Sequence, residues 1–262
     1  MLASCALARH ERRLADFLLW WAEAGAPLLS VQRVRSLAKT MPMDGATEET
    51  LAAFAASAAA GGDRRWKRLA GVEPLDARPG KGAARPTLLV PATLVLRLRA
   101  AFGVSAKADL LAVLLGSDRP LTVRALADRV AYSTVAVRVA LGEIAASGFV
   151  REEAGHPAAY AADAHAWTAL LGHDAAPWGS WSETFALLLD VAAWGARAEA
   201  AGWSGYVAAS KARDLAERHG GAFRRLAPGA PRLDGLRGEA ALPAFASTME
   251  EAIGRINGRT SV

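Results

Sequence analysis

The segment LTVRALADRVAYSTVAVRVALGEIAASGFVREEAGHPAAYAAD, residues 121–163, decides the fold of this chain. Thr122 is an N-cap type of residue, and apolar residues then recur at helical spacing up to Val130, which predicts a first helix. After a short break, Ser133 can cap a second helix. The apolar positions of this second helix fall on one face, and they are Val137, Leu141 and Ile144.

The residues after the second helix predict a small β-hairpin. Gly148 stands where a helix can end in the left-handed conformation. Residues 149–153 and 159–161 can then form two short strands joined through a turn at 155–157. A further helix, at 108–115, precedes the pair of helices and can pack beneath it. The predicted order is therefore helix, helix, tight turn, helix and hairpin.

This order of elements over residues 104–165 resembles the winged helix-turn-helix domain of bacterial transcription regulators of the MarR and ArsR kind. The spacing from Val130 to Gly148 matches the pattern of that family without a gap, whereas Ala131 stands where the family often has Gly. The resemblance implies DNA binding, with the helix at 133–147 in the major groove. The alternative is a protein–protein interaction adaptor that uses the same fold without binding DNA.

The second helix of the pair carries the predicted base contacts. Thr134 and Arg138 turn outward and can hydrogen-bond base edges or phosphates, and Val135 could touch thymine methyl groups. So few polar side chains predict modest base specificity or readout through DNA shape. An apolar outward face is also what a protein-binding helix would show. Helix N-termini favour phosphate, which adds positioning contacts. The predicted DNA-binding residues are Thr122, Arg124, Ser133, Thr134, Val135, Arg138 and Arg151, with Arg64, Arg65, Lys67, Arg68, Arg97 and Arg99 in a basic segment at 64–99.

The net charge of +5 is concentrated beside this predicted domain. Residues 61–106 contain 9 Lys and Arg against 3 Asp and Glu, whereas residues 107–165 contain 6 against 7. Binding to phosphates needs clustered cations, so the basic segment could supply what the slightly acidic domain lacks. For residues 64–68 two interpretations stay open, a basic arm on the DNA backbone and a solvated linker. In the predicted wing, Glu152 and Glu153 beside Arg151 argue against deep insertion into a groove.

The composition is rich in Ala and Arg and predicts a mainly α fold. Residues 93–102 favour a helix, although the alternation Leu-Val-Leu-Arg-Leu would also allow a strand. A central winged helix-turn-helix with a small β-hairpin is thus predicted between N- and C-terminal helical regions. The predicted regions are an N-terminal helical region at 1–60, a basic Pro- and Gly-rich connector at 61–92, the winged helix-turn-helix domain at 93–165, and a C-terminal helical region at 166–262 for dimerisation or effector binding.

Five of the eight tryptophans lie in the C-terminal region, from Trp167 to Trp203. Core packing is the simplest interpretation, and the alternatives are an aromatic pocket for a small apolar effector or a dimer interface. By the resemblance, a homodimer would read two half-sites about one helical turn, or ~34–36 Å, apart.

Several other classes of protein are disfavoured by the sequence. Cys5 is the single cysteine, which rules out an internal disulfide framework and a multi-thiolate metal site. The spacing of His156, His165 and His173 fits no known metal site, so neither a metal nor a cofactor is predicted. The longest apolar stretch, residues 87–96, is too short to span a bilayer, which predicts a cytoplasmic protein without a membrane partner. No nucleophile, carboxylate pair or dinucleotide loop has supporting context, and we expect no enzyme.

Overall fold

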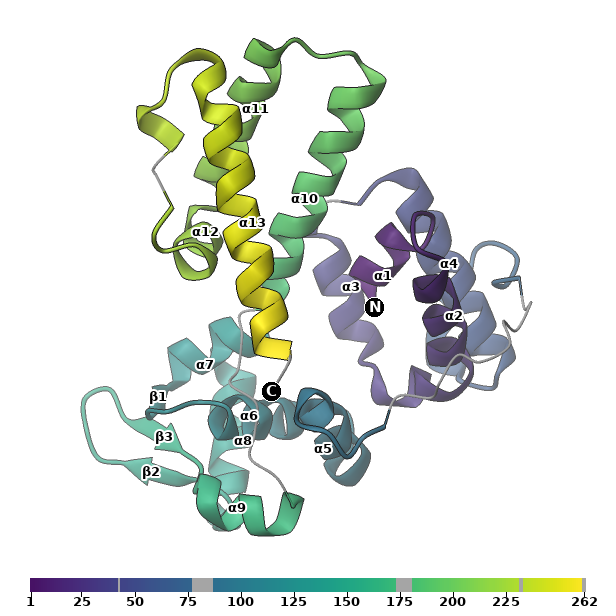
Figure 1. Ribbon diagram of the computed structural model, residues 1–262. Helices are drawn as coiled ribbons and strands as arrows, with labels where there is room; N and C mark the ends of the chain where they lie inside the picture. Colours follow the sequence, from purple (N-terminus) through teal and green to yellow (C-terminus); the bar gives the residue numbers. More distant parts are fainter. Residues whose placement is uncertain (42, 77–86, 173–180, 231–232, 261–262) are drawn as a thin grey trace. The chain divides into compact units, whose positions relative to one another are not determined.

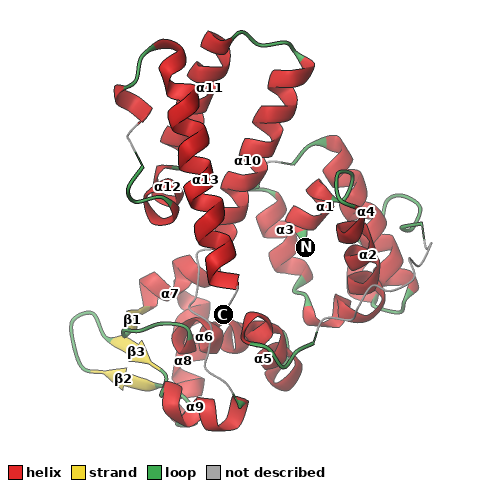
Figure 2. Cartoon of the chain, viewed as in Figure 1, coloured by secondary structure: helices red, strands yellow, loops and turns green. Residues whose placement is uncertain are grey.

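The computed structural model describes residues 1–41, 43–76, 87–172, 181–230 and 233–260 (Figure 1). The chain divides into two compact units, Met1–Gly179 and Ser180–Val262. Helices make up most of both units, which confirms the prediction of a mainly α fold (Figure 2). In the described parts of the chain, no helix combines the length and the apolar character that crossing a membrane requires.

The first part of unit 1 is a group of helices around its own apolar core. Ser30 and Asp44 cap two of them, because each side-chain oxygen accepts a hydrogen bond from a backbone N–H in the first helical turn. Phe54 and Trp66 are both fully buried in this core and meet edge to face, with ring centroids 5.0 Å apart. The N-terminal helices are α1 (Leu2–Leu7), α2 (Arg12–Trp20), α3 (Val31–Ala38) and α4 (Gly45–Ala60), with a π-helical turn at Trp21–Gly25 and 3-10 turns at Ala26–Leu28 and Arg64–Trp66.

The predicted connector at 61–92 is corrected in its first part. Trp66, Leu69 and Leu75 pack on the N-terminal core, and the Leu75 N–H donates to Ser57 Oγ at 2.8 Å. Burial of a whole indole removes a large apolar area from water, so this stretch is held on the N-terminal helices. The middle of the predicted connector, 77–86, lies outside the described residues.

The central bundle follows at residues 87–172 and belongs to the same unit. Its core is α6, in which every residue from Ala108 to Leu115 is buried, and α7 and α8 pack against it and against each other (Figure 1). The helical interpretation of residues 93–102 is confirmed by α5. The helices are α5 (Leu94–Phe102), α6 (Ala106–Leu115), α7 (Val123–Val130), α8 (Thr134–Ala146) and α9 (Ala164–Leu171), with a 3-10 turn at Pro91–Thr93.

A three-stranded antiparallel sheet completes the central bundle. The strands β2 (Arg151–Glu153) and β3 (Ala159–Ala161) form the predicted hairpin. A third strand, β1 (Leu121–Thr122), pairs with the other edge of β3, so the order is β1-β3-β2. Tyr160 on β3 lies opposite Leu121 on one side and Glu152 on the other. The sheet therefore ties the start of α7 to the hairpin that follows α8.

The domain boundary predicted between residues 165 and 166 is corrected by helix α9, which belongs to the first unit. Asp163 caps this helix, because its carboxylate accepts hydrogen bonds from the His165 and Ala166 amides. Trp167 and Leu171 are buried in the core of the central bundle. A boundary before residue 166 would cut through this packed helix, and the first unit instead extends to Gly179.

Unit 2 is a helical bundle with a separate apolar core. Trp194 and Phe223 both pack on Phe245, with ring centroids 5.2 Å and 5.9 Å from it. The buried Asp190 carboxylate accepts hydrogen bonds from His219 at 2.7 Å and from Arg218 at 3.0 Å. The helices are α10 (Trp181–Ala200), α11 (Gly205–Arg218), α12 (Gly220–Leu226) and α13 (Ala241–Thr260), with 3-10 turns at Leu233–Gly235 and Gly238–Ala240.

Candidate nucleic-acid interface

Helix α8 begins at a tight turn after α7, and both helices are capped as the sequence predicts. Thr122 Oγ1 accepts a hydrogen bond from the Ala125 N–H at 3.3 Å, and Ser133 Oγ accepts one from the Ala136 N–H at 3.2 Å. Between the two helices, Ala131 is left-handed, with φ 52° and ψ 45°. This conformation reverses the chain within three residues and sets the direction in which α8 leaves the turn.

One face of α8 is exposed along the first two turns. Val137, Leu141 and Ile144 are buried in the central core, so the opposite positions face solvent. Val135 is 66% exposed and Val139 60%, so two large apolar side chains lie on this surface. We define the α8 face as Thr134, Val135, Arg138 and Val139, all of which are exposed.

Arg138 connects the α8 face to the sheet. Among the described residues, its guanidinium has no carboxylate partner. Burial raises the pKa of Tyr160 on β3, the charge of Glu152 raises it further, and the charge of Arg138 opposes both. The positive charge of Arg138 thus acts on the sheet at Tyr160.

Two other arginines predicted to contact DNA are paired with carboxylates. Arg124 lies 3.5 Å from Asp128 on α7, and Arg151 lies 3.1 Å from Glu153 on the hairpin. Both pairs are exposed, and such pairs contribute only about 0–1 kcal/mol to stability. A phosphate could replace either carboxylate at little cost in free energy.

The basic segment separates into exposed and structural arginines. Arg64, Lys67 and Arg68 are exposed around the buried Trp66. Arg65 also holds the turn, because its guanidinium donates to the Asp63 carboxylate at 2.6–2.8 Å and to the Ala26 carbonyl at 3.1 Å. Its side chain is still 47% exposed, so all four cations at 64–68 lie on the surface, and one of them is already paired with a carboxylate.

Two predicted phosphate contacts have guanidinium groups that bind inside the unit, and the prediction is wrong for Arg99, whose charge is neutralised there. Arg97 donates to the Leu171 carbonyl at 2.7 Å and ties α5 to α9. Arg99 is only 11% exposed and binds both oxygens of Asp109, at 2.8 Å and 3.0 Å. Asp109 lies in the first turn of α6 and is 1% exposed, so its charge neutralises Arg99 inside the protein.

Asp109 also binds a second arginine, which no sequence pattern predicts. Arg33 on α3 donates from Nη1 to the Asp109 carboxylate, and its guanidinium carbon lies 5.2 Å from the centroid of the Tyr132 ring. Burial raises the pKa of Tyr132, so this ring stays neutral beneath the cation. A signal for this cluster exists in the sequence, since Asp109 is a lone carboxylate in the apolar run at 108–115.

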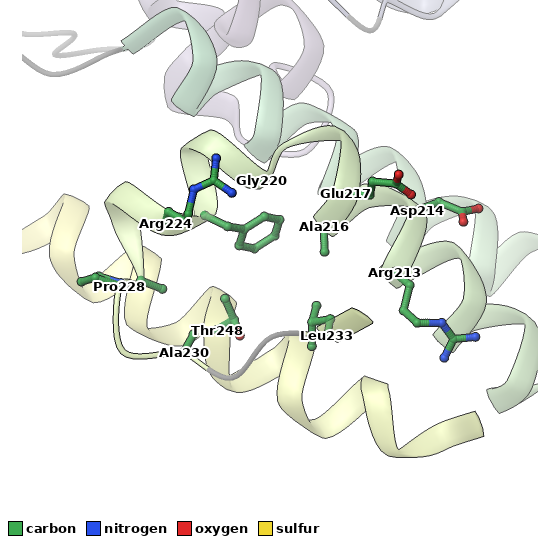
Figure 3. A pocket seen from close by; sticks show the side chains of 12 residues that line it. Arg213, Asp214, Ala216, Glu217, Gly220, Arg224, Pro228, Ala230, Leu233 and Thr248 are labelled. Carbon is green, nitrogen blue, oxygen red and sulfur yellow. The ribbon is translucent and has the colours of Figure 1, made fainter. Parts of the chain in front are cut away.

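Unit 2 contains a cavity of about 760 Å³ between α11, α12 and α13 (Figure 3). Phe223, Leu233 and Thr248 line it, and Arg213 and Arg224 lie at its ends. The volume lies within the range of small-molecule sites. Among the described residues, Phe223 is the one aromatic side chain that lines this cavity. A second cavity, of about 410 Å³ in the central bundle, is lined by Trp167, Phe149 and Leu170, so one of the five C-terminal tryptophans does line a pocket. Trp178 lies outside the described residues.

The described histidines do not form a metal site. His156 and His165 are exposed, and His173 lies outside the described residues. Within the described residues, no group of three or more His, Cys, Asp or Glu side chains is arranged to hold a metal ion.

Comparisons with known proteins give no relative from which a role could be transferred. No family model matches the chain, and neither a curated protein nor a solved structure matches it.

Proposed function

We propose that the central bundle is a winged helix-turn-helix domain and that the protein is a DNA-binding transcriptional regulator. The observation that carries this proposal is the α8 face, in which Thr134 and Arg138 lie outward on a capped helix whose other side is fixed in the core. The major groove of B-DNA, about 12 Å wide, admits an α-helix. Arg138 would then bind the acceptor edge of a guanine, and Val135 would lie against thymine methyl groups.

Phosphate contacts come from a smaller set than the sequence suggested. Arg64, Lys67 and Arg68 are exposed and can neutralise phosphates directly. Arg124 and Arg151 can join them by exchanging an exposed carboxylate for a phosphate. The first turns of α7 and α8, at Thr122 and Ser133, add backbone N–H groups that favour phosphate. These contacts would orient the protein on the duplex while the α8 face reads the bases.

Two further parts of the proposal concern assembly and control. A homodimer would place two copies of α8 in successive major grooves, ~34–36 Å apart. The cavity in unit 2 would take a small effector with an apolar body, since Phe223 and Leu233 supply apolar surface and Arg224 lies at one end. Because the resemblance is to bacterial regulators, the proposal places the protein in the cytoplasm, together with DNA.

The alternative is a protein-binding adaptor, and one observation favours it. The high exposure of Val135 and Val139 gives the α8 face an apolar strip of the kind that docks on another protein. An adaptor would bury this strip in a protein interface and would have no use for Arg138 as a base-reading residue.

The test is a selection of bound duplexes from a random DNA pool with the full chain, repeated with Arg138→Ala. We expect an enriched sequence for the parent, and a loss of about 1–3 kcal/mol of discrimination at one base pair for the variant. Arg13→Ala is the matched control, because Arg13 is an exposed arginine on α2. If Arg138→Ala enriches the same sequence as strongly as the parent and the control, Arg138 does not read bases.

A further inference from the structure

The turn that precedes α8 contains a strained residue, Ala131, whose own side chain does not stabilise its conformation. Ala131 adopts the left-handed conformation, which is unfavourable for any residue with a Cβ. Such residues persist where their surroundings hold them in place. Ala131 is itself exposed, so its own methyl group does not supply the restraint. The restraint must come from the neighbouring residues of the turn.

Tyr132 is the anchored neighbour, because its ring packs on the core of the central bundle and is covered by a residue of the N-terminal helices. Arg33 on α3 covers the Tyr132 ring at 5.2 Å while its guanidinium binds Asp109. Asp109 is at the same time held by both nitrogens of the Arg99 fork. The ring of Tyr132 is thus fixed between the central bundle and a residue of a different part of the unit.

The contact between the N-terminal helices and the central bundle is polar at this point. The apolar side chains of the two parts form separate buried clusters. Arg99 extends the polar contact by donating to the Leu28 carbonyl at 3.1 Å. Arg33 Nε is buried without a hydrogen-bond partner, so the cluster is not fully satisfied. A polar and incompletely satisfied contact can open more readily than a shared apolar core.

We propose that Arg33 and Tyr132 are positioning residues, through which the docked N-terminal helices hold the turn at Ala131 and order the first turn of α8. Undocking would release Tyr132, let Ala131 relax and loosen the turn of α8 that carries Thr134. The N-terminal helices would thereby regulate the α8 face. The effect on DNA binding rests on the proposed function, whereas the effect on the order of α8 does not.

The first experiment measures hydrogen exchange of the amides at 136–138 in the full chain, because the amides of Ala136 and Val137 donate to Ser133 in the first turn of α8. Arg33→Met removes the guanidinium but keeps the length of the side chain, and it leaves Asp109 paired with Arg99. We expect these amides to exchange about fivefold faster, the factor equivalent to the ~1 kcal/mol strain of a left-handed residue with a Cβ. Arg35→Met is the matched control, since Arg35 is an exposed arginine on the same helix.

The second experiment removes the strain itself. Glycine adopts the left-handed conformation without a steric cost, so Ala131→Gly should make α8 nearly insensitive to Arg33→Met. If Arg33 had a merely structural role, Arg33→Met would speed exchange equally in the parent and in the Ala131→Gly protein. That outcome would overturn the proposal. An Arg33→Met protein that exchanges like the Arg35→Met control would also overturn it.

The affinity for the selected duplex is measured on the same proteins. If the parent binds DNA but neither exchange nor affinity responds to Arg33→Met, the positioning role is refuted and the proposed function stands. If the parent binds no DNA but exchange responds only in the Ala131 background, the positioning role is supported and the proposed function fails.

Discussion

Removal of the Asp109 charge should be among the most destabilising single changes in unit 1. Asp109→Asn keeps the shape of the side chain but leaves Arg99 and Arg33 without their shared counter-ion. The two arginine side chains are 11% and 18% exposed, so solvent compensates little of the lost interaction. Removing one partner of a buried ion pair costs about 3–5 kcal/mol, a large part of the ~5–15 kcal/mol that stabilises a typical domain.

The assay is native-state hydrogen exchange of the α6 amides in the full chain under increasing urea. Exchange at chosen amides reports on unit 1 itself, which a single unfolding curve of a chain with two units would not. Glu143→Gln is the control, because the Lys107–Glu143 pair spans 2.6 Å but is about half exposed on both sides. We expect the control to cost about 0–1 kcal/mol. An Asp109→Asn protein that loses no more stability than the control would refute the role of the cluster.

The other predictions concern acid sensitivity and the phosphate contacts. Hydrogen bonds from Thr47 lower the pKa of Asp44 to about 2, so the stability that this cap contributes is present above about pH 4 and is lost as the pH falls toward about 2. Asp44→Asn should therefore lose less stability than the parent between about pH 5 and about pH 2, as measured by native-state hydrogen exchange of the α4 amides. Neutralising the exposed cations Arg64, Lys67 and Arg68 should weaken binding to all duplexes alike. The slope of log affinity against log salt concentration should fall by about 1 per lost contact, and an unchanged slope would exclude these cations from the interface. Glu153→Gln frees the hairpin arginine and should tighten binding in a gel-shift titration; unchanged affinity would place the hairpin away from DNA.

The parts of the fold that could be predicted from the sequence are those determined by local chemistry. Thr122 and Ser133 cap α7 and α8 through hydrogen bonds that span three residues, and the apolar spacing within α8 fixes its buried side. The exposed positions Thr134 and Arg138 follow from that spacing. Strand β1, with only two residues, is too short to produce a periodic signal.

The parts that could not be predicted depend on contacts between distant segments. Arg33 and Asp109 are separated by 76 positions, and no local pattern shows that they meet. The same holds for Arg99, whose position in a basic segment suggested phosphate binding although its charge is neutralised inside the protein. Trp66 is a related case, because a stretch rich in charged residues and glycine predicts a connector, whereas the Trp66 indole is fully buried.

The most direct test of the central claim is a gel-shift titration of the full chain with a random duplex at low and increasing salt. A protein that places the α8 face in a groove and several cations on phosphates should bind, with an affinity that falls steeply and linearly as the logarithm of the salt concentration rises. The same titration with a duplex that carries the selected sequence should retain tighter binding at every salt concentration. Absence of salt-sensitive binding to both duplexes would contradict the DNA-binding account and favour the protein-binding adaptor.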